Sequence, residues 1–311
     1  MVACLLAGLS VGLPERSFAT EPARDAKELL KAFSSVQHSW QQMNVAEEMI
    51  KLGDKSVVAD IEPFLTSETR QERCNAALVL AALGDDRGSA IILREFNDKE
   101  PRPTELFRSD GKPDPKSQII EDRSYAAFLL ARLKVRSAVP ALIEALNDER
   151  LTYRAAISLG TIGDASAIPA LLAVSRNDPQ NRLWAGYGLA KLGEQTGFDI
   201  LIETLSDSHW VPRRHAVEAL GSMGDPRMTP HLIKALKDER VQVRVSAAVS
   251  LEKIGDESAL PPLQEALKVS EINQKKAGSL IDADDLIWEG RFPGAANKAI
   301  DSIKARANKA L

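Results

Sequence analysis

His215 lies in the stretch RRHAVEALGSMGD (213–225) and is the side chain whose type and position could best serve as a metal ligand. A metal ion needs several nitrogen, oxygen or sulfur ligands that converge on it. The chain has four histidines: His38, His209, His215 and His231. Their spacing along the chain would not place several of them on one ion. The sequence therefore predicts no metal ion and no cofactor.

Motifs of other catalytic chemistries are also missing from the sequence. It contains no phosphate-binding glycine loop, no zinc-protease helix motif and no nucleophile elbow. Acidic residues such as Asp282, Asp284 and Asp285 are numerous, and we expect them to be solvated charges. Of the two cysteines, Cys74 is predicted to be a small buried apolar residue. We expect a non-enzymatic protein without catalytic residues.

Composition limits the class of partner. The 311 residues carry a net charge of −4, and basic and acidic residues are interspersed along the chain. Because a nucleic-acid interface needs a basic patch or stripe, nucleic acid is not an expected partner. The sequence does not indicate an oligomeric state.

Residues 1–19 have the features of an export signal. An apolar run from Val2 to Leu13 is followed by Ser17, Phe18 and Ala19, a small-x-small cleavage pattern. About 12 apolar residues are too few to cross a bilayer, so no integral membrane segment is expected. No Lys or Arg precedes the run, which leaves two alternatives: a start further upstream, or an apolar cap packed on the first helices. We expect cleavage near Ala19 and a periplasmic or otherwise exported protein, with a cytoplasmic location as the alternative.

A period close to 31 residues organises the rest of the chain. The period is marked by a recurring glycine, at Gly53, Gly84, Gly163, Gly193, Gly224 and Gly255. Lys134 occupies the one position of this series that has no glycine. Seven repeats result, one of them enlarged by an insertion at 97–120. The insertion contains four prolines, and we expect an irregular loop that acts either as a flap or as a tether.

Each repeat has the pattern of a helical hairpin. The residues four and eight before the glycine position are apolar in every repeat, and the latter is alanine in six of the seven. These offsets follow one face of an α-helix. A second apolar stripe follows the glycine, for example Val139, Leu142 and Leu146, with a proline in its first turn. Because one hairpin cannot bury both stripes, the repeats must stack. We predict an all-α solenoid of about seven hairpins. Residues 20–52 form an N-terminal helical cap and the first repeat helix, 53–269 form the repeat array, and 270–311 form a C-terminal helical cap.

Two charged columns accompany the apolar stripes. Five repeats carry an arginine eleven residues before the glycine position: Arg73, Arg123, Arg182, Arg213 and Arg244. The other two repeats have Gln42 and Thr152 there. Six repeats carry an acidic residue directly after the glycine position: Asp54, Asp85, Asp164, Glu194, Asp225 and Asp256. The remaining repeat has Val135 there. We interpret both columns as structural, through ion pairs between turns or capping of the following helix.

The segments VRVSAAVSLEKIGDESALPPLQEALK (243–268) and SAVPALIEALNDER (137–150) resemble HEAT repeats, and more narrowly the short repeats of the phycobilisome-lyase-like family. The resemblance extends over roughly residues 40 to 269. Members include bilin lyase subunits, deoxyhypusine hydroxylase and bacterial scaffolds. The resemblance implies that the helix ending at the glycine column lines the concave face. The hydroxylase binds iron with His-Glu pairs nine and eight residues before the glycine, where this chain has only His215 and no glutamate. The resemblance therefore does not imply an iron site.

The column nine residues before the glycine is the candidate binding surface. It contains Tyr125, Arg154, Trp184 and His215 on consecutive repeats, with Phe128 and Tyr187 three residues further on. Aromatic and arginine side chains dominate binding hot spots, although Phe128 and Tyr187 could instead fill gaps between helices. We expect partner contacts at Tyr125, Arg154, Trp184, Tyr187 and His215. The predicted function is a scaffold that binds a protein or peptide on its concave face. The alternative is a bilin-lyase-like or chaperone-type subunit that assists cofactor attachment to a partner protein.

Overall fold

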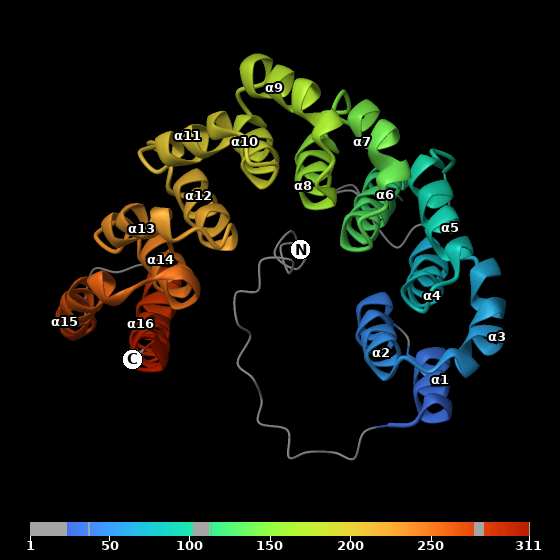
Figure 1. Ribbon diagram of the computed structural model, residues 1–311, viewed down its shortest axis with the longest axis horizontal. Coiled ribbons are helices and arrows are strands. Elements are labelled where there is room, and N and C mark those ends of the chain that lie inside the picture. Colours follow the sequence, from blue (N-terminus) through green and yellow to red (C-terminus); the bar gives the residue numbers. More distant parts are fainter. Residues whose placement is uncertain (1–23, 37, 102–111, 113, 277–282, 311) are drawn as a thin grey trace. The chain divides into compact units, whose positions relative to one another are not determined.

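The computed structural model describes residues 24–36, 38–101, 112, 114–276 and 283–310, and they form helices joined by short turns (Figure 1). The predicted signal peptide lies outside these residues, and so do residues 102–111 and 113 of the predicted loop. The described residues divide into two compact units, the first ending at Leu192 and the second beginning at Gly193. The first is called the N-terminal unit and the second the C-terminal unit below.

The N-terminal unit contains ten α-helices within the described residues. They are α1 (Ala26–Ser35), α2 (Ser39–Leu52), α3 (Val58–Ile61), α4 (Arg70–Ala82), α5 (Asp86–Asn97), α6 (Pro115–Arg132), α7 (Val139–Ala145), α8 (Thr152–Ile162), α9 (Ile168–Asn177) and α10 (Arg182–Lys191). Short 3-10 turns lie at Lys55–Val57, Glu62–Thr66, Arg136–Ala138 and Ala165–Ala167.

The described part of the C-terminal unit contains six α-helices. They are α11 (Gln195–Thr204), α12 (Trp210–Ser222), α13 (Thr229–Ala235), α14 (Val241–Ile254), α15 (Leu260–Lys276) and α16 (Ala283–Ala310). Its 3-10 turns lie at Pro226–Met228 and Glu257–Ala259.

The helices follow the predicted repeats. Helices α2 to α15 form seven consecutive pairs along the chain, and α1 and α16 flank them. In the N-terminal unit, the first helices of the pairs pack on one another, and the second helices lie in an outer row (Figure 1). The first helices lie on the concave side of this unit, as the resemblance implied. The all-α solenoid prediction is confirmed.

Lys134 confirms the register of the repeat without its glycine. Its φ is 52°, in the left-handed region that Gly53, Gly84, Gly163, Gly193 and Gly224 also occupy. Only Gly255 departs from the column, with a φ of −65°. A residue with a Cβ atom is strained in this region. The turn geometry is therefore imposed by the packing of the flanking helices, even where the residue does not favour it.

Replacing Lys134 with glycine is expected to raise the free energy of unfolding by roughly 0.5–1 kcal/mol. The left-handed conformation costs a non-glycine residue about 1–2 kcal/mol, and the greater freedom of glycine in the unfolded chain offsets part of that gain. Urea unfolding of the purified variant measures the change. Lys134→Ala retains the Cβ atom and should give no gain. An equal gain from alanine would assign the effect to the lysine charge.

The acidic column caps the following turns, as predicted. The carboxylate of Asp54 accepts a hydrogen bond from the amide of Ser56 at 2.8 Å, and Asp164 accepts one from Ser166 at 3.0 Å. Asp85, Asp225 and Asp256 cap their turns in the same way. Glu194 is an exception, because its side chain makes no capping hydrogen bond. Satisfied backbone donors at each turn stabilise the entry into the second helix.

The arginines of the column connect the first helix of a pair to the loop before it and to a carboxylate. Arg73 donates from Nη1 to the carbonyl of Ser67 at 2.6 Å and pairs with Glu95 through Nε and Nη2. Arg213 and Arg244 repeat the arrangement with Asp238 and Glu289. Even Thr152, an exception to the column, donates to the carbonyl of Leu146 six residues earlier, at 3.2 Å. The column is structural, as its sequence pattern predicted.

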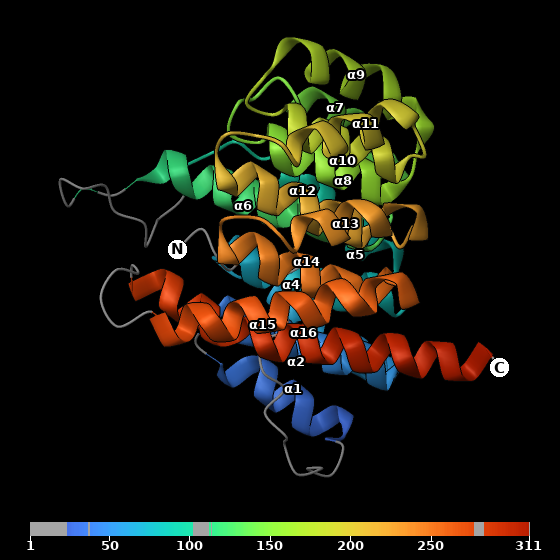
Figure 2. The ribbon, with the colours of Figure 1, turned by 90° about the vertical axis from the view of Figure 1, so that its left-hand side faces the viewer.

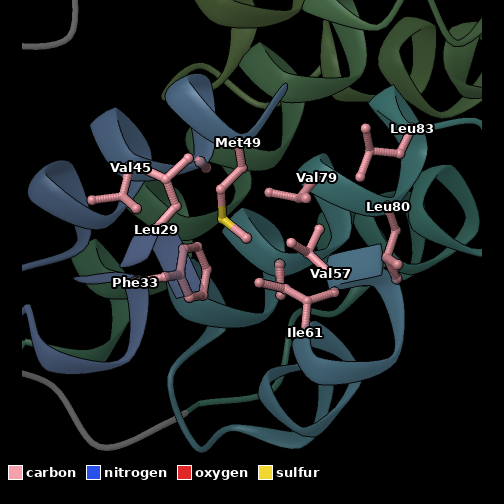
Figure 3. Close-up of a cluster of buried hydrophobic side chains, with 11 residues drawn as sticks. Leu29, Phe33, Val45, Met49, Val57, Ile61, Val79, Leu80 and Leu83 are labelled. Atoms are coloured by element: carbon pink, nitrogen blue, oxygen red, sulfur yellow. The ribbon is translucent and has the colours of Figure 1, made fainter. Parts of the chain in front are cut away.

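The N-terminal cap buries its own apolar core. Leu29 and Phe33 of α1 point toward Val45 and Met49 of α2, and this cluster continues into the next two helices (Figure 3). Phe33 and Phe64 meet edge to face, with ring centroids 5.1 Å apart. Helix α1 therefore closes the apolar face that the first hairpin would otherwise expose to water.

The C-terminal cap consists of a long helix, α16. Helix α16 packs against both α14 and α15 (Figure 2), as a cap must.

The prediction of an irregular loop over 97–120 is wrong for residues 115–120, which are the first turns of α6. Pro115 is in the first turn and Asp114 is the N-cap, accepting from the Ser117 amide at 3.0 Å. Proline suits that first turn because its missing N–H would have no helical partner there.

Candidate functional site

The five predicted contact residues fall into both units. Tyr125 lies on α6, Arg154 on α8, and Trp184 and Tyr187 on α10, all in the N-terminal unit. His215 lies on α12 in the C-terminal unit. A continuous series of side chains is therefore described only for α6, α8 and α10, which pack on one another in that order.

Tyr125 is half-buried at the end of a polar network across three helices. Its hydroxyl donates to Oδ1 of Asn75 on α4, and Asn75 donates from Nδ2 to Oε1 of Gln42 on α2 at 2.9 Å. Asn75 is fully buried, and burial raises the pKa of the Tyr125 hydroxyl. Tyr125 is therefore a neutral hydrogen-bond donor that is held in place, with part of its ring still accessible.

Trp184 packs against Tyr153, an aromatic residue that was not among the predicted contact residues. Its ring centroid lies 6.0 Å from that of Tyr153 on α8, at an interplanar angle of 56°. The Arg154 guanidinium lies 5.2 Å from the centroid of the Tyr153 ring. Tyr153 and Trp184 are both half-buried, so each offers part of a ring to a partner. The signal was available, because Tyr153 stands one residue before the column that contains Arg154 and Trp184.

Arg154 and Tyr187 are less accessible than the sequence predicted. Arg154 is 4% exposed and Tyr187 is 7% exposed. The packing of α8 on α10 is unusually close, because a Cβ atom on Gly160 would lie 2.7 Å from the Cα atom of Gly188. Tyr187, one residue before Gly188, is covered by its neighbours and by Lys191, whose Nζ lies 5.8 Å from the ring centroid. These two side chains support the surface rather than forming it, as the gap-filling alternative for Tyr187 allowed.

Four half-buried aromatic side chains therefore remain on the first helices of three consecutive pairs. We call them the aromatic strip: Tyr125 and Phe128 on α6, Tyr153 on α8 and Trp184 on α10. Cationic groups lie at the C-terminal ends of α6 and α10, Arg132 and Lys191, and Arg132 pairs with Glu47 at 2.6 Å. Burial and the nearby charge of Lys134 lower the pKa of Lys191. The strip combines apolar area, hydroxyl and indole groups, and flanking positive charge.

His215 belongs to a separate polar cluster in the C-terminal unit. Its Nε2 lies 3.1 Å from Nη2 of Arg214, and burial together with the Arg214 charge lowers its pKa to about 4. The imidazole is therefore neutral near pH 7 and accepts from the guanidinium. On the next turn of α12, the buried Glu218 accepts a hydrogen bond from Ser246 of α14 at 2.8 Å. Burial raises the pKa of the Glu218 carboxyl.

The described residues contain no group of three or more histidine, cysteine or acidic side chains arranged to hold a metal ion. Cys74 is buried, and burial raises the pKa of its thiol, as is typical of an unreactive cysteine. None of the helices in the described ranges combines the length and hydrophobicity that a membrane crossing requires.

Comparison with known families places the chain in a class. The family model described as HEAT repeats matches residues 116–190, 168–251 and 198–277, which together span just over half of the 311 residues. The protein belongs to the HEAT-repeat family. No curated protein matches the chain.

Several solved structures are similar to the chain, and one of them shares its fold. The complex of CpcE and CpcF of phycocyanin lyase from Nostoc sp. PCC7120 is similar at 17% identity and a TM-score of 0.51, over 94% of this chain and 99% of that chain. The E. coli protein YibA matches at 16% identity and a TM-score of 0.39, over 90% and 93% of the two chains. An engineered protein matches at 15% identity and a TM-score of 0.32, over 91% and 92%. At 17% identity, the likeness to the lyase complex concerns the fold alone.

Proposed function

We propose that this protein is a non-enzymatic scaffold that binds a protein or peptide on the concave side of its N-terminal unit, through the aromatic strip. The observation that supports this most is the pairing of Tyr153 with Trp184, 6.0 Å apart and both half-buried, next to the half-buried Tyr125 and Phe128. Aromatic side chains supply large contact area at low entropic cost and are enriched in binding hot spots.

The placement of the other polar groups is consistent with this proposal. The repeated arginines and aspartates are used within the array, in ion pairs and caps, so they do not compete for a partner. The buried Asn75 orients Tyr125 through its hydrogen bond, and Arg154 orients Tyr153 through a cation–π contact. A surface whose side chains are already held in place loses less entropy on binding.

Replacing Trp184 with alanine is expected to weaken partner binding about tenfold, or by about 1–2 kcal/mol, as loss of a hot-spot tryptophan does. The partner is first captured from the native host with the wild-type protein and identified by mass spectrometry. Its affinity for each variant is then measured by isothermal titration calorimetry. Because Trp184 is only half-buried, the variant should remain folded by circular dichroism.

Trp40→Ala is the matched control, because Trp40 is 63% exposed and lies on α2, outside the aromatic strip. Its affinity for the partner should equal that of the wild type. Equal binding by wild type and Trp184→Ala would reject the strip as the binding surface. Unfolding of Trp184→Ala would show that this tryptophan serves the core, and Tyr153→Ala would then test the strip.

A second candidate is a subunit that assists cofactor attachment to a partner protein, because CpcE and CpcF of phycocyanin lyase share the fold over nearly the whole chain. The two candidates differ in cellular location. We propose export for the scaffold, from the apolar run and cleavage pattern at 1–19. Edman sequencing of the mature protein decides between them: a start just after Ala19 supports export, and retention of residues 1–19 favours the attachment subunit.

A further inference from the structure

The turn after α6 departs from the repeat at two consecutive positions. Where the other six repeats have glycine followed by an acidic residue, this turn has Lys134 followed by Val135. Lys134 is held at a φ of 52°, a strained conformation for a residue with a Cβ atom. Val135 is the N-cap of the next 3-10 turn but makes no capping side-chain hydrogen bond. The turn therefore lacks two stabilising features of the repeat, and it has gained a positive charge and lost a negative one.

The fold itself does not account for this lysine. Lys134 is exposed, and it forms no ion pair with any of the described residues. Backbone strain of this kind is concentrated at functional sites, where the side chain has a use that outweighs its cost. The position of the Lys134 ammonium group is therefore the feature that needs a functional explanation.

A second lysine lies near Lys134. Lys191 is the last residue of α10 and is exposed, with its Nζ 5.8 Å from the centroid of the Tyr187 ring. Burial of part of the side chain lowers the pKa of Lys191, and Lys134 is the one charged residue that adds to this effect. Two like charges are thus held close to each other beside the aromatic strip, and they repel.

The carboxylates at this end of the helices do not neutralise the two lysines. Glu47 pairs with Arg132 at 2.6 Å, and Asp164 accepts a hydrogen bond from the amide of Ser166 at 3.0 Å. Glu194, in the turn after α10, forms no ion pair with either lysine. Neither α8 nor α10 contains an acidic residue. This end of the aromatic strip is therefore positively charged, although the whole chain has a net charge of −4.

The lysines lie within reach of a segment bound to the aromatic strip. Trp184 and Lys191 are seven residues apart on α10, and seven residues of α-helix span about 10 Å. An extended peptide advances about 3.3 Å per residue. A group that contacts Trp184 would therefore be about three residues away from a group that contacts Lys191.

We propose that Lys134 and Lys191 bind carboxylate groups of the partner protein, in an acidic segment whose apolar side chains contact the aromatic strip. This rests on the proposed function and names the chemistry of its partner: an aromatic or aliphatic anchor, with acidic residues about three positions further along. Charge complementarity identifies the occupant, because the replacement of glycine and a carboxylate by Lys134 and Val135 favours a negatively charged segment at this position.

The test uses the full chain and a fluorescein-labelled peptide of two phenylalanines, two glycines and three glutamates, titrated by fluorescence anisotropy. A peptide with glutamines in place of the glutamates is the uncharged comparison. We expect the acidic peptide to bind at least tenfold more tightly. Lys134→Gly should weaken its binding about tenfold, as loss of a charge-assisted hydrogen bond does, and leave the glutamine peptide unchanged. Lys191→Gln should act in the same way. Because Lys134→Gly is also expected to stabilise the fold, unfolding would not explain the loss.

Lys253→Gln is the matched control, since Lys253 is an exposed lysine at the repeat position of Lys191 but lies on α14 in the C-terminal unit. Equal weakening by Lys253→Gln and Lys134→Gly would overturn the proposal in favour of diffuse charge attraction. Equal affinity of the wild type for both peptides would overturn it and leave the aromatic strip as the binding surface. Trp184→Ala should weaken both peptides, and unchanged binding of both would reject the strip and this proposal together. Displacement of the acidic peptide by an equal concentration of a thymidine oligonucleotide would assign the surface to nucleic acid instead.

Discussion

Replacing Arg73 with alanine is expected to lower the free energy of unfolding by about 3–5 kcal/mol, the cost of breaking a buried ion pair from one side. The Arg73 and Glu95 side chains are 8% and 4% exposed, and they are joined by two hydrogen bonds of 2.9 and 2.6 Å. Burial alone would raise the pKa of Glu95, but hydrogen bonds from Arg73 and Arg94 more than offset it, so the pKa is lowered. The variant would remove the donor that the carbonyls of Ser67 and Glu68 share, and the two hydrogen bonds from Arg73 to the Glu95 carboxylate.

Urea unfolding followed by circular dichroism measures the loss. Arg87→Ala is the comparison, because the Arg87 side chain is 57% exposed and its ion pairs with Asp85 and Glu62 are screened by solvent. It should leave the unfolding midpoint nearly unchanged. If Arg73→Ala were equally mild, the arginine column would not carry the stability that its contacts indicate.

Leu189→Ala is the second variant for which we expect a large loss, about 2–5 kcal/mol. Leu189 is fully buried on α10, at the position four residues before the repeat glycine. Its removal would leave a cavity that the close contact of α8 with α10 at Gly160 and Gly188 prevents from collapsing. The same urea unfolding series measures the change.

Leu52→Ala is its matched control, since the same side chain is removed from a position that is 44% exposed. We expect a clearly smaller change there, because partly solvated methyl groups lose less on truncation. A loss at Leu52 as large as that at Leu189 would contradict the assignment of the apolar stripe. It would mean that the exposed end of α2 is covered in solution.

The candidate sites were only partly predictable from sequence. Tyr125 and Trp184 are half-buried, whereas Arg154 in the same column is buried, so membership of the column does not by itself predict exposure. Tyr153 was missed because it stands one residue outside the column. The proximity of Lys134 to Lys191 was also beyond reach, since these residues belong to different helix pairs and come together only through the packing of α6, α8 and α10.

The pattern of residues predicted the helices, their pairing and their turns, except for the first turns of α6 at 115–120. These depend on neighbours a few residues away: apolar side chains that share one helix face, a proline in a first turn, and a carboxylate that caps the next amide. Even Lys134 could be placed in the glycine column by spacing alone, and its φ of 52° bears this out. Local chemistry repeated seven times leaves little ambiguity.

Which side chains of each column remain accessible, and which charges pair, follows from the packing of the helices in space. Arg73 meets Glu95 22 residues later, whereas Arg244 meets Glu289 45 residues later, on the cap helix α16. The same arginine position thus takes its carboxylate from different elements. The physical reason is that burial and ion pairing depend on how closely two backbones approach. That distance is set by small residues on both helices, such as Gly160 and Gly188, and not by either helix alone.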